Sequence, residues 1–386
     1  MFLVESPPVA YSDPWQASRE DRLESLLRGD RRVAYFYESP DSSTFRYRVY
    51  NMIQVLRGCG RDIAAAYFTS DDLAILDKIV DSADVLVFCR TRYTGQINRA
   101  ITRARSKGKR VLFDIDDLVY DTRYVHLVLD TLDQDLNHPD VWDHWFAYVA
   151  RLGAVLRLCD GVITTNEYLA EQIRGFGGKR VSVVPNFLNR EQMEVSERIF
   201  EEKQSRGFKT NGQIHLGYFS GTPTHNKDLG TVAESLANLM RRDTRLVLRV
   251  VGFMDIPQRL RSLGSRIETY PLCDFLNLQR EIGLVEVNLV PLQNNEFTNC
   301  KSELKYFEAG IVGTLTVASP VFTFAQSIRD GWNGFLAESH EWDEKIASLL
   351  RDFGSYPDLA QRAFVDCEDR FAWYKQARRL EDALFT

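Results

Sequence analysis

The chain has 386 residues, of which 44% are hydrophobic and 26% are charged, a composition typical of a globular protein with length for two domains. Acidic residues outnumber basic residues by 54 to 48, so no overall positive field is present to bind nucleic acid. The six cysteines lie far apart without a C-x-x-C pair, which argues against a disulfide framework or a zinc site. Because the sequence shows no basic leader and no long apolar span, we expect a cytoplasmic protein.

Residues 1–30 are predicted to form an N-terminal arm with a short helix over Gln16–Gly29. After the arm, short β-rich apolar runs alternate with helical segments, which is typical of parallel sheets covered by helices. Strands are predicted in the first half at Val33–Tyr37, Ile63–Phe68, Val85–Cys89, Val111–Ile115, Val162–Thr165 and Val181–Val184. In the second half they are predicted at Ile214–Phe219, Leu246–Val251, Val285–Val290 and Leu315–Ala318.

A polar stretch without a strand pattern, residues 189–213, separates the two sets and is interpreted as a linker. The sequence therefore predicts an α/β protein with two Rossmann-like domains, at 31–188 and 214–372. Open parallel sheets bind ligands beyond the carboxyl ends of their strands, so we expect functional loops to follow strands and to face a cleft between the domains.

The segment Asn299–Gly310 follows a predicted strand and has the pattern of a loop that opens a helix. Ser302 is expected as the helix N-cap, where free backbone N–H groups and the charge of Lys301 would favour a phosphate. Lys301, Lys305 and Glu308 would share one helix face, and the Glu308 carboxylate could accept ribose hydroxyls. The alternative is a surface helix whose lysines pair with Glu308.

A second loop, Tyr218–Leu229, leads into a helix expected from about Asn226 to Met240. Gly221 would let the backbone approach a ligand closely. His225 could donate a hydrogen bond to phosphate oxygens, and Lys227 could supply a point charge. By itself, this Gly-Thr-Pro sequence indicates only a turn.

Together these segments resemble the retaining, nucleotide-sugar-dependent glycosyltransferases of family four, which have the two-domain GT-B architecture. That family carries a glycine loop with a lysine six residues later, matched by Gly221 and Lys227, and a glutamate in an E-A-x-x-x-G run, matched by Glu308. Its I-x-D-G-x-N-G-x-L turn is matched by Ile328–Leu336. The end of its acceptor domain is similar to Thr164–Ile173 and Val183–Asn186.

The resemblance implies transfer of a sugar, with retention and without a metal or other cofactor, from a nucleoside-diphosphate donor to a glycan or lipid-linked acceptor. Surface polysaccharide assembly is the implied role. The donor would be held by Gly221, Thr222, His225, Lys227, Lys301, Ser302, Lys305 and Glu308. The final helix, within residues 373–386, would return to complete the first domain.

Three family positions differ in this chain. The first carboxylate of the family's glutamate pair is replaced by Cys300, and the arginine after the loop glycine is replaced by Thr222. The acceptor-domain histidine is matched by Asp116, which could accept sugar hydroxyls or orient the nucleophile. We therefore expect Asp116, Lys227 and Glu308 to act in catalysis. A non-catalytic descendant that binds a glycan or a partner is the alternative.

The stretch Asp114-Ile-Asp116-Asp117 permits other interpretations. It resembles the D-x-D of haloacid-dehalogenase-like magnesium phosphatases, with Asp114 as the nucleophile and Asp116 as the acid or base. Against that reading, Leu118 replaces the expected threonine and no later G-D-x-x-x-D motif follows. Aspartates that merely cap a loop are a further alternative. In the glycosyltransferase interpretation, Asp117 lies on the acceptor side.

Two basic features could bind anions. Arg46 and Arg48 open a predicted helix and could bind a phosphorylated or carboxylated acceptor, or donor phosphates. Residues 90–110 hold eight Lys or Arg and no acidic residue, which could support a peripheral contact with an anionic membrane. In both cases a solvated helix is the alternative.

Overall fold

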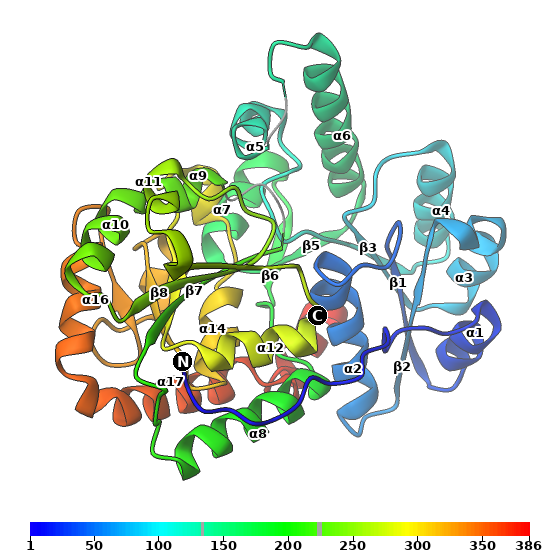
Figure 1. Cartoon of the computed structure of the whole chain (residues 1–386). Coiled ribbons are helices and arrows are strands. Elements are labelled where there is room, and N and C mark those ends of the chain that lie inside the picture. Colours follow the sequence, from blue (N-terminus) through cyan, green and yellow to red (C-terminus); the bar gives the residue numbers. More distant parts are fainter. Residues whose placement is uncertain (133–134, 222–225) are drawn as a thin grey trace.

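The computed structural model of the chain describes residues 1–132, 135–221 and 226–386. In this part of the chain the strands form two parallel six-stranded sheets that lie side by side and are covered by helices (Figure 1). The predicted α/β class with two Rossmann-like sheets is therefore confirmed. Buried apolar residues from both halves join in one continuous cluster, so the two sheets share a core.

The first sheet has the strand order β2-β1-β3-β4-β5-β6. Its strands are β1 (Arg31–Phe36), β2 (Ile63–Phe68), β3 (Val85–Cys89), β4 (Arg110–Asp114), β5 (Gly161–Thr164) and β6 (Arg180–Val183). Its helices are α1 (Arg19–Leu27), α2 (Asn51–Gly58), α3 (Leu76–Ser82), α4 (Gly95–Ser106), α5 (Val125–Thr131), α6 (Pro139–Leu158) and α7 (Glu167–Gly177). A π-helix over Arg46–Tyr50 runs directly into α2. Every residue of β3 is buried, as expected for a strand covered on both faces.

The second sheet has the strand order β12-β11-β10-β7-β8-β9. Its strands are β7 (Ile214–Ser220), β8 (Leu246–Gly252), β9 (Ile267–Tyr270), β10 (Val287–Val290), β11 (Leu315–Ala318) and β12 (Phe335–Leu336). The chain enters this half through α8 (Arg190–Ser205). The helices that follow are α9 (Asn226–Gly230), α10 (Ala233–Arg242), α11 (Gln258–Arg261), α12 (Phe275–Leu284), α13 (Glu296–Asn299), α14 (Leu304–Gly310), α15 (Phe322–Ser327), α16 (Trp342–Arg351), α17 (Tyr356–Phe371) and α18 (Ala377–Phe385).

Each strand predicted from an apolar run is present. The strands that the sequence pattern missed, β9 and β12, lie at the two edges of the second sheet. Both are short, and β9 has two exposed residues, so neither carries the continuous apolar run of a buried strand. The single helix expected from about Asn226 to Met240 is instead two helices, α9 and α10.

The predicted linker 189–213 contains the 16-residue helix α8. Asn189 caps this helix by accepting a hydrogen bond from a backbone N–H in its first turn. Apolar residues at helical spacing, including Met193 and Phe200, are buried, while most of the intervening residues are polar. The pattern of an amphipathic helix was therefore present in a stretch whose overall polarity suggested a linker.

A buried lysine attaches α8 to the end of α14. The Nζ atom of Lys203 donates to the carbonyl oxygens of Val312 (2.8 Å) and Gly313 (2.9 Å) and to the hydroxyl of Thr314 (3.1 Å). Burial holds the pKa of Lys203 well below its usual value. Its three donors satisfy the turn that ends α14, and they fix this helix relative to the linker helix.

The N-terminal arm contacts both halves. Phe2 packs against Tyr356 in the second half, with ring centroids 5.3 Å apart. Trp15 lies between Phe45 of the first half (5.6 Å) and Phe275 of the second (6.1 Å). In Figure 1 the arm runs along α8 and α12 before it reaches α1.

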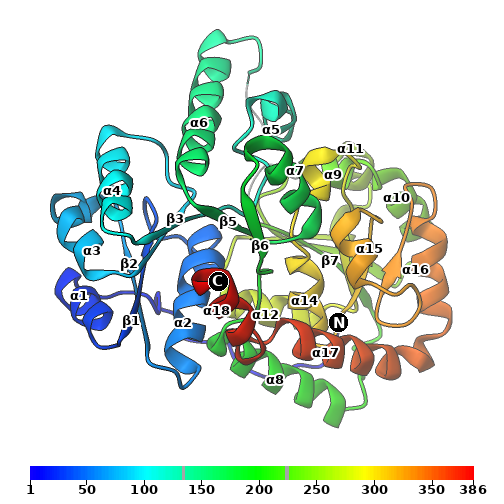
Figure 2. The same cartoon turned by 180° about the vertical axis from the view of Figure 1, so that it is seen from behind.

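The C-terminal helix returns to the first sheet. Figure 2 shows α17 crossing the second half and α18 beside α2. Glu381 of α18 pairs with Arg31 of β1 at 2.7 Å, and the Arg31 guanidinium stacks on Phe385. Among the helices that the structure describes, none is long and apolar enough to cross a membrane.

A buried ion pair lies beneath the carboxyl end of the first sheet. Arg48 and Asp114 are both fully buried, and the guanidinium donates to both carboxylate oxygens, at 2.8 and 2.9 Å. A further N–H of Arg48 donates to the carbonyl oxygen of Val184 at 2.7 Å. Arg48 therefore joins β4 to the end of β6, in contrast to the expectation that it binds an acceptor.

We predict that Arg48→Ala lowers the free energy of unfolding by about 3–5 kcal/mol, because it leaves the Asp114 carboxylate buried without its partner. The matched control is Arg105→Ala, which removes a half-exposed pair with Asp160 and should cost under about 1 kcal/mol. Urea unfolding followed by circular dichroism measures both values. Equal losses in the two variants would contradict the structural role of Arg48.

Candidate active site between the two sheets

Each sheet has one point where the order of its strands reverses. In the second sheet the chain adds β8 and β9 on one side of β7 and then β10 and β11 on the other, so the reversal lies between β7 and β10. In the first sheet it lies between β1 and β3. Ligands of open parallel sheets bind beyond the carboxyl ends of strands at such points. Most of the residues predicted from the sequence lie in loops or helices that follow these strands.

Glu308 of α14 is held by side chains from the first half and from α8. It is 4% exposed, and its Oε1 accepts a short hydrogen bond from the Tyr47 hydroxyl. Arg46 Nη2 and Gln192 Nε2 lie 3.5 Å from the same oxygen. Arg46 and Tyr47 belong to the π-helix, a rare conformation that is frequent at functional sites. Arg46, expected on the acceptor side, thus reaches the carboxylate expected to bind ribose.

Lys301 also meets the first half. Its Nζ lies 3.0 Å from Oδ2 of Asp117. The amide of Asn166, at the start of α7, donates to the carbonyl oxygen of the neighbouring Cys300 at 2.9 Å. Cys300 itself is buried within the apolar cluster of the first half, where burial raises the pKa of its thiol. Where the family has its first carboxylate, this chain therefore has a buried cysteine that packs against apolar residues of the first half.

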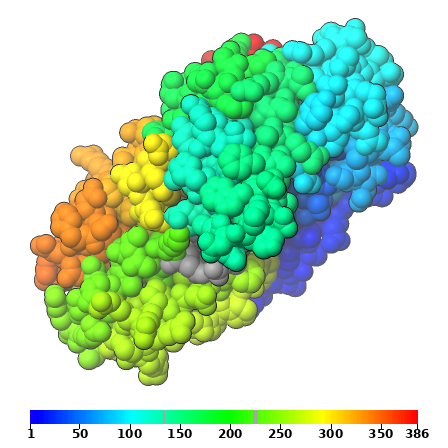
Figure 3. Space-filling model, turned by 90° about the horizontal axis from the view of Figure 1, so that it is seen from above, coloured from blue at the N-terminus to red at the C-terminus, as the bar shows by residue number. Residues whose placement is uncertain are grey.

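Helix α9, the first helix after β7, contributes Lys227. Its Nζ pairs with the carboxylate of Asp130 at the end of α5, and both side chains are about half exposed. Figure 3 shows the region of α5 and α6 lying against this part of the second half. A Cβ added to Gly221 would meet no described atom within 4 Å. Thr222 and His225 lie outside the described residues, and their roles stay predictions.

The expected N-cap at Ser302 is wrong. Helix α14 begins at Leu304, and Glu303 occupies the N-cap position without a capping hydrogen bond from its side chain to a described residue. The backbone of Glu303, at φ −76° and ψ 19°, lies outside the α-helical region, so the first helical residue is Leu304. The Ser302 hydroxyl is buried and has no partner among the described residues. Burial raises the pKa of Glu303 to about 7.

Lys305 lies deeper on the same helix. Its ammonium stands 5.1 Å from the centroid of the Tyr218 ring and makes no ion pair within the described residues. Burial lowers its pKa to about 8, an effect that Asp228 and Glu308 oppose and that Lys301 reinforces. Lys305 is thus a desolvated cation at the strand-order reversal between β7 and β10, where an anion would stabilise its charge.

Asp116 and Asp117 follow β4 and face Arg90, which follows β3. Arg90 Nε lies 2.5 Å from Oδ1 of Asp116, and Arg90 Nη2 lies 3.6 Å from Oδ2 of Asp117. The Thr44 hydroxyl donates to Asp116 at 3.4 Å. In the sequence, Arg90 is distinguished only as a member of the basic stretch 90–110. Arg90 directly follows the buried strand β3, and this position was the sequence signal that could have marked it as a site residue.

The geometry does not favour a phosphatase centred on Asp114. Both of its carboxylate oxygens accept hydrogen bonds from Arg48, and its side chain is 1% exposed, so neither oxygen is free to attack a phosphate. In the part of the chain that the structure describes, no group of three or more His, Cys, Asp or Glu side chains could hold a metal ion.

The basic stretch 90–110 is partly neutralised by acids of neighbouring elements. Arg103 and Lys107 both pair with Asp81, each at 2.6 Å. Arg105 pairs with Asp160 at 2.7 Å. The surface of α4 therefore carries less uncompensated positive charge than the sequence suggests.

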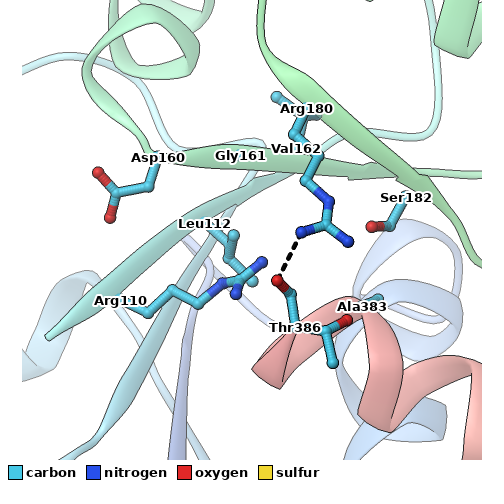
Figure 4. A pocket seen from close by; sticks show the side chains of 9 residues that line it. All are labelled: Arg110, Leu112, Asp160, Gly161, Val162, Arg180, Ser182, Ala383 and Thr386. Atoms are coloured by element: carbon cyan, nitrogen blue, oxygen red, sulfur yellow. Dashed lines mark hydrogen bonds between the residues drawn. The ribbon is translucent and has the colours of Figure 1, made fainter.

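A separate pocket of about 250 Å³ lies near the amino ends of β4, β5 and β6 (Figure 4). Arg110 and Arg180 line it, and Arg180 donates to the carbonyl oxygen of Thr386 at 2.5 Å. It contains none of the predicted site residues and lies at the opposite end of the strands from Asp116.

Comparisons with known proteins agree with this architecture. Residues 214–352 match the family model described as glycosyl transferases group 1, which covers most of the second half. A comparison with curated proteins gives no match.

Among solved structures, HepE from Anabaena, in complex with UDP and glucose, is 12% identical, with a TM-score of 0.60 over 91% of this chain and 98% of HepE. The sucrose-phosphate synthase of Thermosynechococcus elongatus is 15% identical, with a TM-score of 0.60 over 91% of this chain and 97% of that protein. At these identities the likeness establishes the fold. The chain therefore has the two-domain GT-B fold of glycosyltransferases, and its residues 214–352 are similar to the glycosyl transferases group 1 domain.

Proposed function

We propose that this protein is a glycosyltransferase that moves a sugar from a nucleoside-diphosphate donor to a glycan or lipid-linked acceptor, with retention of configuration and without a metal ion. One observation carries the proposal. Lys301, Lys305 and Glu308 follow β10 at the strand-order reversal of the second sheet, and they face the first half. Lys301 pairs there with Asp117, which follows β4, and Glu308 contacts Arg46 and Tyr47, which follow β1. UDP and glucose in the HepE structure support a UDP-sugar as the donor class to test first.

In this proposal each group has a distinct task. Glu308 accepts hydrogen bonds from the donor ribose. Lys227, Lys301 and Lys305 stabilise the negative charge that grows on the departing diphosphate, which is the kind of electrostatic term that contributes most to many enzymes. Asp116 orients the acceptor hydroxyl. The assignments of retention and of a role in surface polysaccharide assembly rest on the family-four resemblance.

Donor binding would exchange one set of partners for another. Tyr47 now donates to Glu308, and Asp117 and Asp130 now neutralise Lys301 and Lys227. Ribose hydroxyls can donate to Glu308 as the Tyr47 hydroxyl does. Phosphate oxygens can replace the two aspartates, so the incoming donor satisfies the same groups.

A membrane contact through 90–110 is part of the proposal for a lipid-linked acceptor only. Arg99 is exposed on α4 and makes no ion pair with a described residue, which supports a weak contact. One such cation contributes about 1 kcal/mol near an anionic surface, too little to hold the protein there alone.

We predict that the protein binds one nucleoside diphosphate, with UDP the first candidate, and that Glu308→Gln weakens this binding by about tenfold or more through loss of a charge-assisted hydrogen bond. Calorimetric titration with UDP, GDP, ADP, CMP and dTDP, with magnesium or with EDTA, measures the dissociation constants. The matched control is Glu296→Gln, an exposed carboxylate on α13. If no nucleotide binds, the non-catalytic alternative replaces the enzyme.

A second prediction concerns pH. Below about pH 8 Lys305 is protonated and attracts the diphosphate, whereas above its pKa of about 8 the amine is neutral. The affinity for the nucleotide should therefore fall several-fold as pH rises from about 7 to about 9. Lys305→Met should bind more weakly at pH 7 and lose most of this pH dependence. Lys345→Met, which removes a partly exposed cation paired with Asp330, should keep it. An unchanged pH profile in Lys305→Met would exclude contact with the phosphate.

A further inference from the structure

We propose that Arg90 is a positioning residue that holds the carboxylates of Asp116 and Asp117 in place for the acceptor. This inference rests on the proposed function and extends it to a residue that neither the sequence motifs nor the family model distinguishes. Three observations carry it: the backbone conformation of Arg90, the two carboxylates that its side chain contacts, and the link from one of these to the donor side.

The backbone of Arg90 has a conformation that favours glycine. Its φ is +39°, and among the described residues other than glycine only Arg90 and Phe208 have positive φ. L-residues adopt this region at an energetic cost, and such strain tends to collect at functional sites. The Arg90 N–H donates to the carbonyl oxygen of Asp114 at 3.0 Å, so the turn after β3 is fixed against β4. A side chain stands here although glycine would fit the turn without strain.

The side chain of Arg90 contacts two adjacent carboxylates. Its Nε lies 2.5 Å from Oδ1 of Asp116, and its Nη2 lies 3.6 Å from Oδ2 of Asp117. All three side chains are largely buried, with exposures of 20%, 13% and 13%. Burial opposes the charge of Arg90, but the two aspartates outweigh it and raise its pKa above the usual value. One guanidinium therefore offsets the repulsion between two like charges and sets their orientation.

The same cluster reaches the donor side. Asp117 also accepts Lys301 at 3.0 Å, so the contacts run from Asp116 through Arg90 and Asp117 to the loop before α14. When a donor phosphate takes Lys301, Arg90 is the cation left to pair with Asp117. Without Arg90, Asp116 would keep the Thr44 hydroxyl as a partner and would be free to turn away from the acceptor.

Arg92 provides a matched control. It lies two residues further along the same loop and pairs with Glu38, with both N–H···O distances at 2.6 Å. Its side chain is 35% exposed. Within the described part of the chain it forms an ion pair with Glu38 and with neither Asp116 nor Asp117.

The experiment is the hydrolysis of UDP-glucose, or of the sugar nucleotide whose base binds in the titration above, by the full chain. Arg90→Gln should lower kcat about tenfold or more while KM for the donor stays within about twofold, because the defect lies at the nucleophile. Arg92→Gln should change neither value. Arg90→Gln combined with Asp116→Asn should be no slower than Asp116→Asn alone, because Arg90 acts through Asp116.

Each outcome has a distinct meaning. If the wild-type chain binds no nucleotide and hydrolyses no donor, the proposed function fails and this inference fails with it. If the wild type is active but Arg90→Gln matches Arg92→Gln, or the double variant shows additive losses, only this inference is overturned. Arg90→Gly tests the role without backbone strain, in case the glutamine variant does not fold. Normal kcat in Arg90→Gly would show that the turn alone is needed and would overturn the inference.

Discussion

Pairing of cations with carboxylates across the boundary of the two sheets is the interaction on which the rest of the site depends. Lys301 meets Asp117, Lys227 meets Asp130, and Glu308 is held by Arg46 and Tyr47. Glu308 and Arg46 are buried, and Asp117 is largely buried, so leaving one of these groups unpaired would be costly. The Lys227–Asp130 pair is about half exposed and contributes less. The pairs therefore hold the two halves in register, and they hold the same groups that a nucleotide and an acceptor would need.

The same pairs therefore have two roles, one in holding the two halves together and one in binding the donor. Each pair links the two halves, and in the proposed function a donor group of the same charge or hydrogen-bonding type can replace one partner of each pair. Lys305 differs, because within the described residues it has only the Tyr218 ring and more distant carboxylates to offset its burial. It is the cation with the most to gain from a bound anion. Arg90, in contrast, already contacts two carboxylates, those of Asp116 and Asp117.

The architecture could be predicted from local sequence because buried parallel strands are continuous apolar runs, such as Val85–Cys89. The pattern failed where burial is weak, at the edge strand Ile267–Tyr270. It failed again where a helix is mostly polar, at Arg190–Ser205, although Met193 and Phe200 carried its buried face. At the edge strand, tertiary pairing and not local hydrophobicity decides the structure. In Arg190–Ser205 the local amphipathic pattern was present, but the overall polarity of the stretch concealed it.

The candidate site was predictable one loop at a time but not as a set of partners. The spacing of Lys301, Lys305 and Glu308 placed them near one another on or beside a helix. Their partners lie far away in the chain: Tyr47 is 261 residues from Glu308, and Asp117 is 184 residues from Lys301. The N-cap at Ser302 was wrong because Glu303 is itself non-helical and occupies the N-cap position, a backbone feature that side-chain preference alone does not reveal. The strain at Arg90 is likewise a property of the folded backbone.

A crystal structure of the chain with UDP tests the central claim most directly. The account predicts that the diphosphate lies against Lys301 and Lys305, that the ribose hydroxyls donate to Glu308, and that Tyr47 no longer does. UDP bound elsewhere, with the contacts from Tyr47 to Glu308 and from Lys301 to Asp117 still intact, would contradict it.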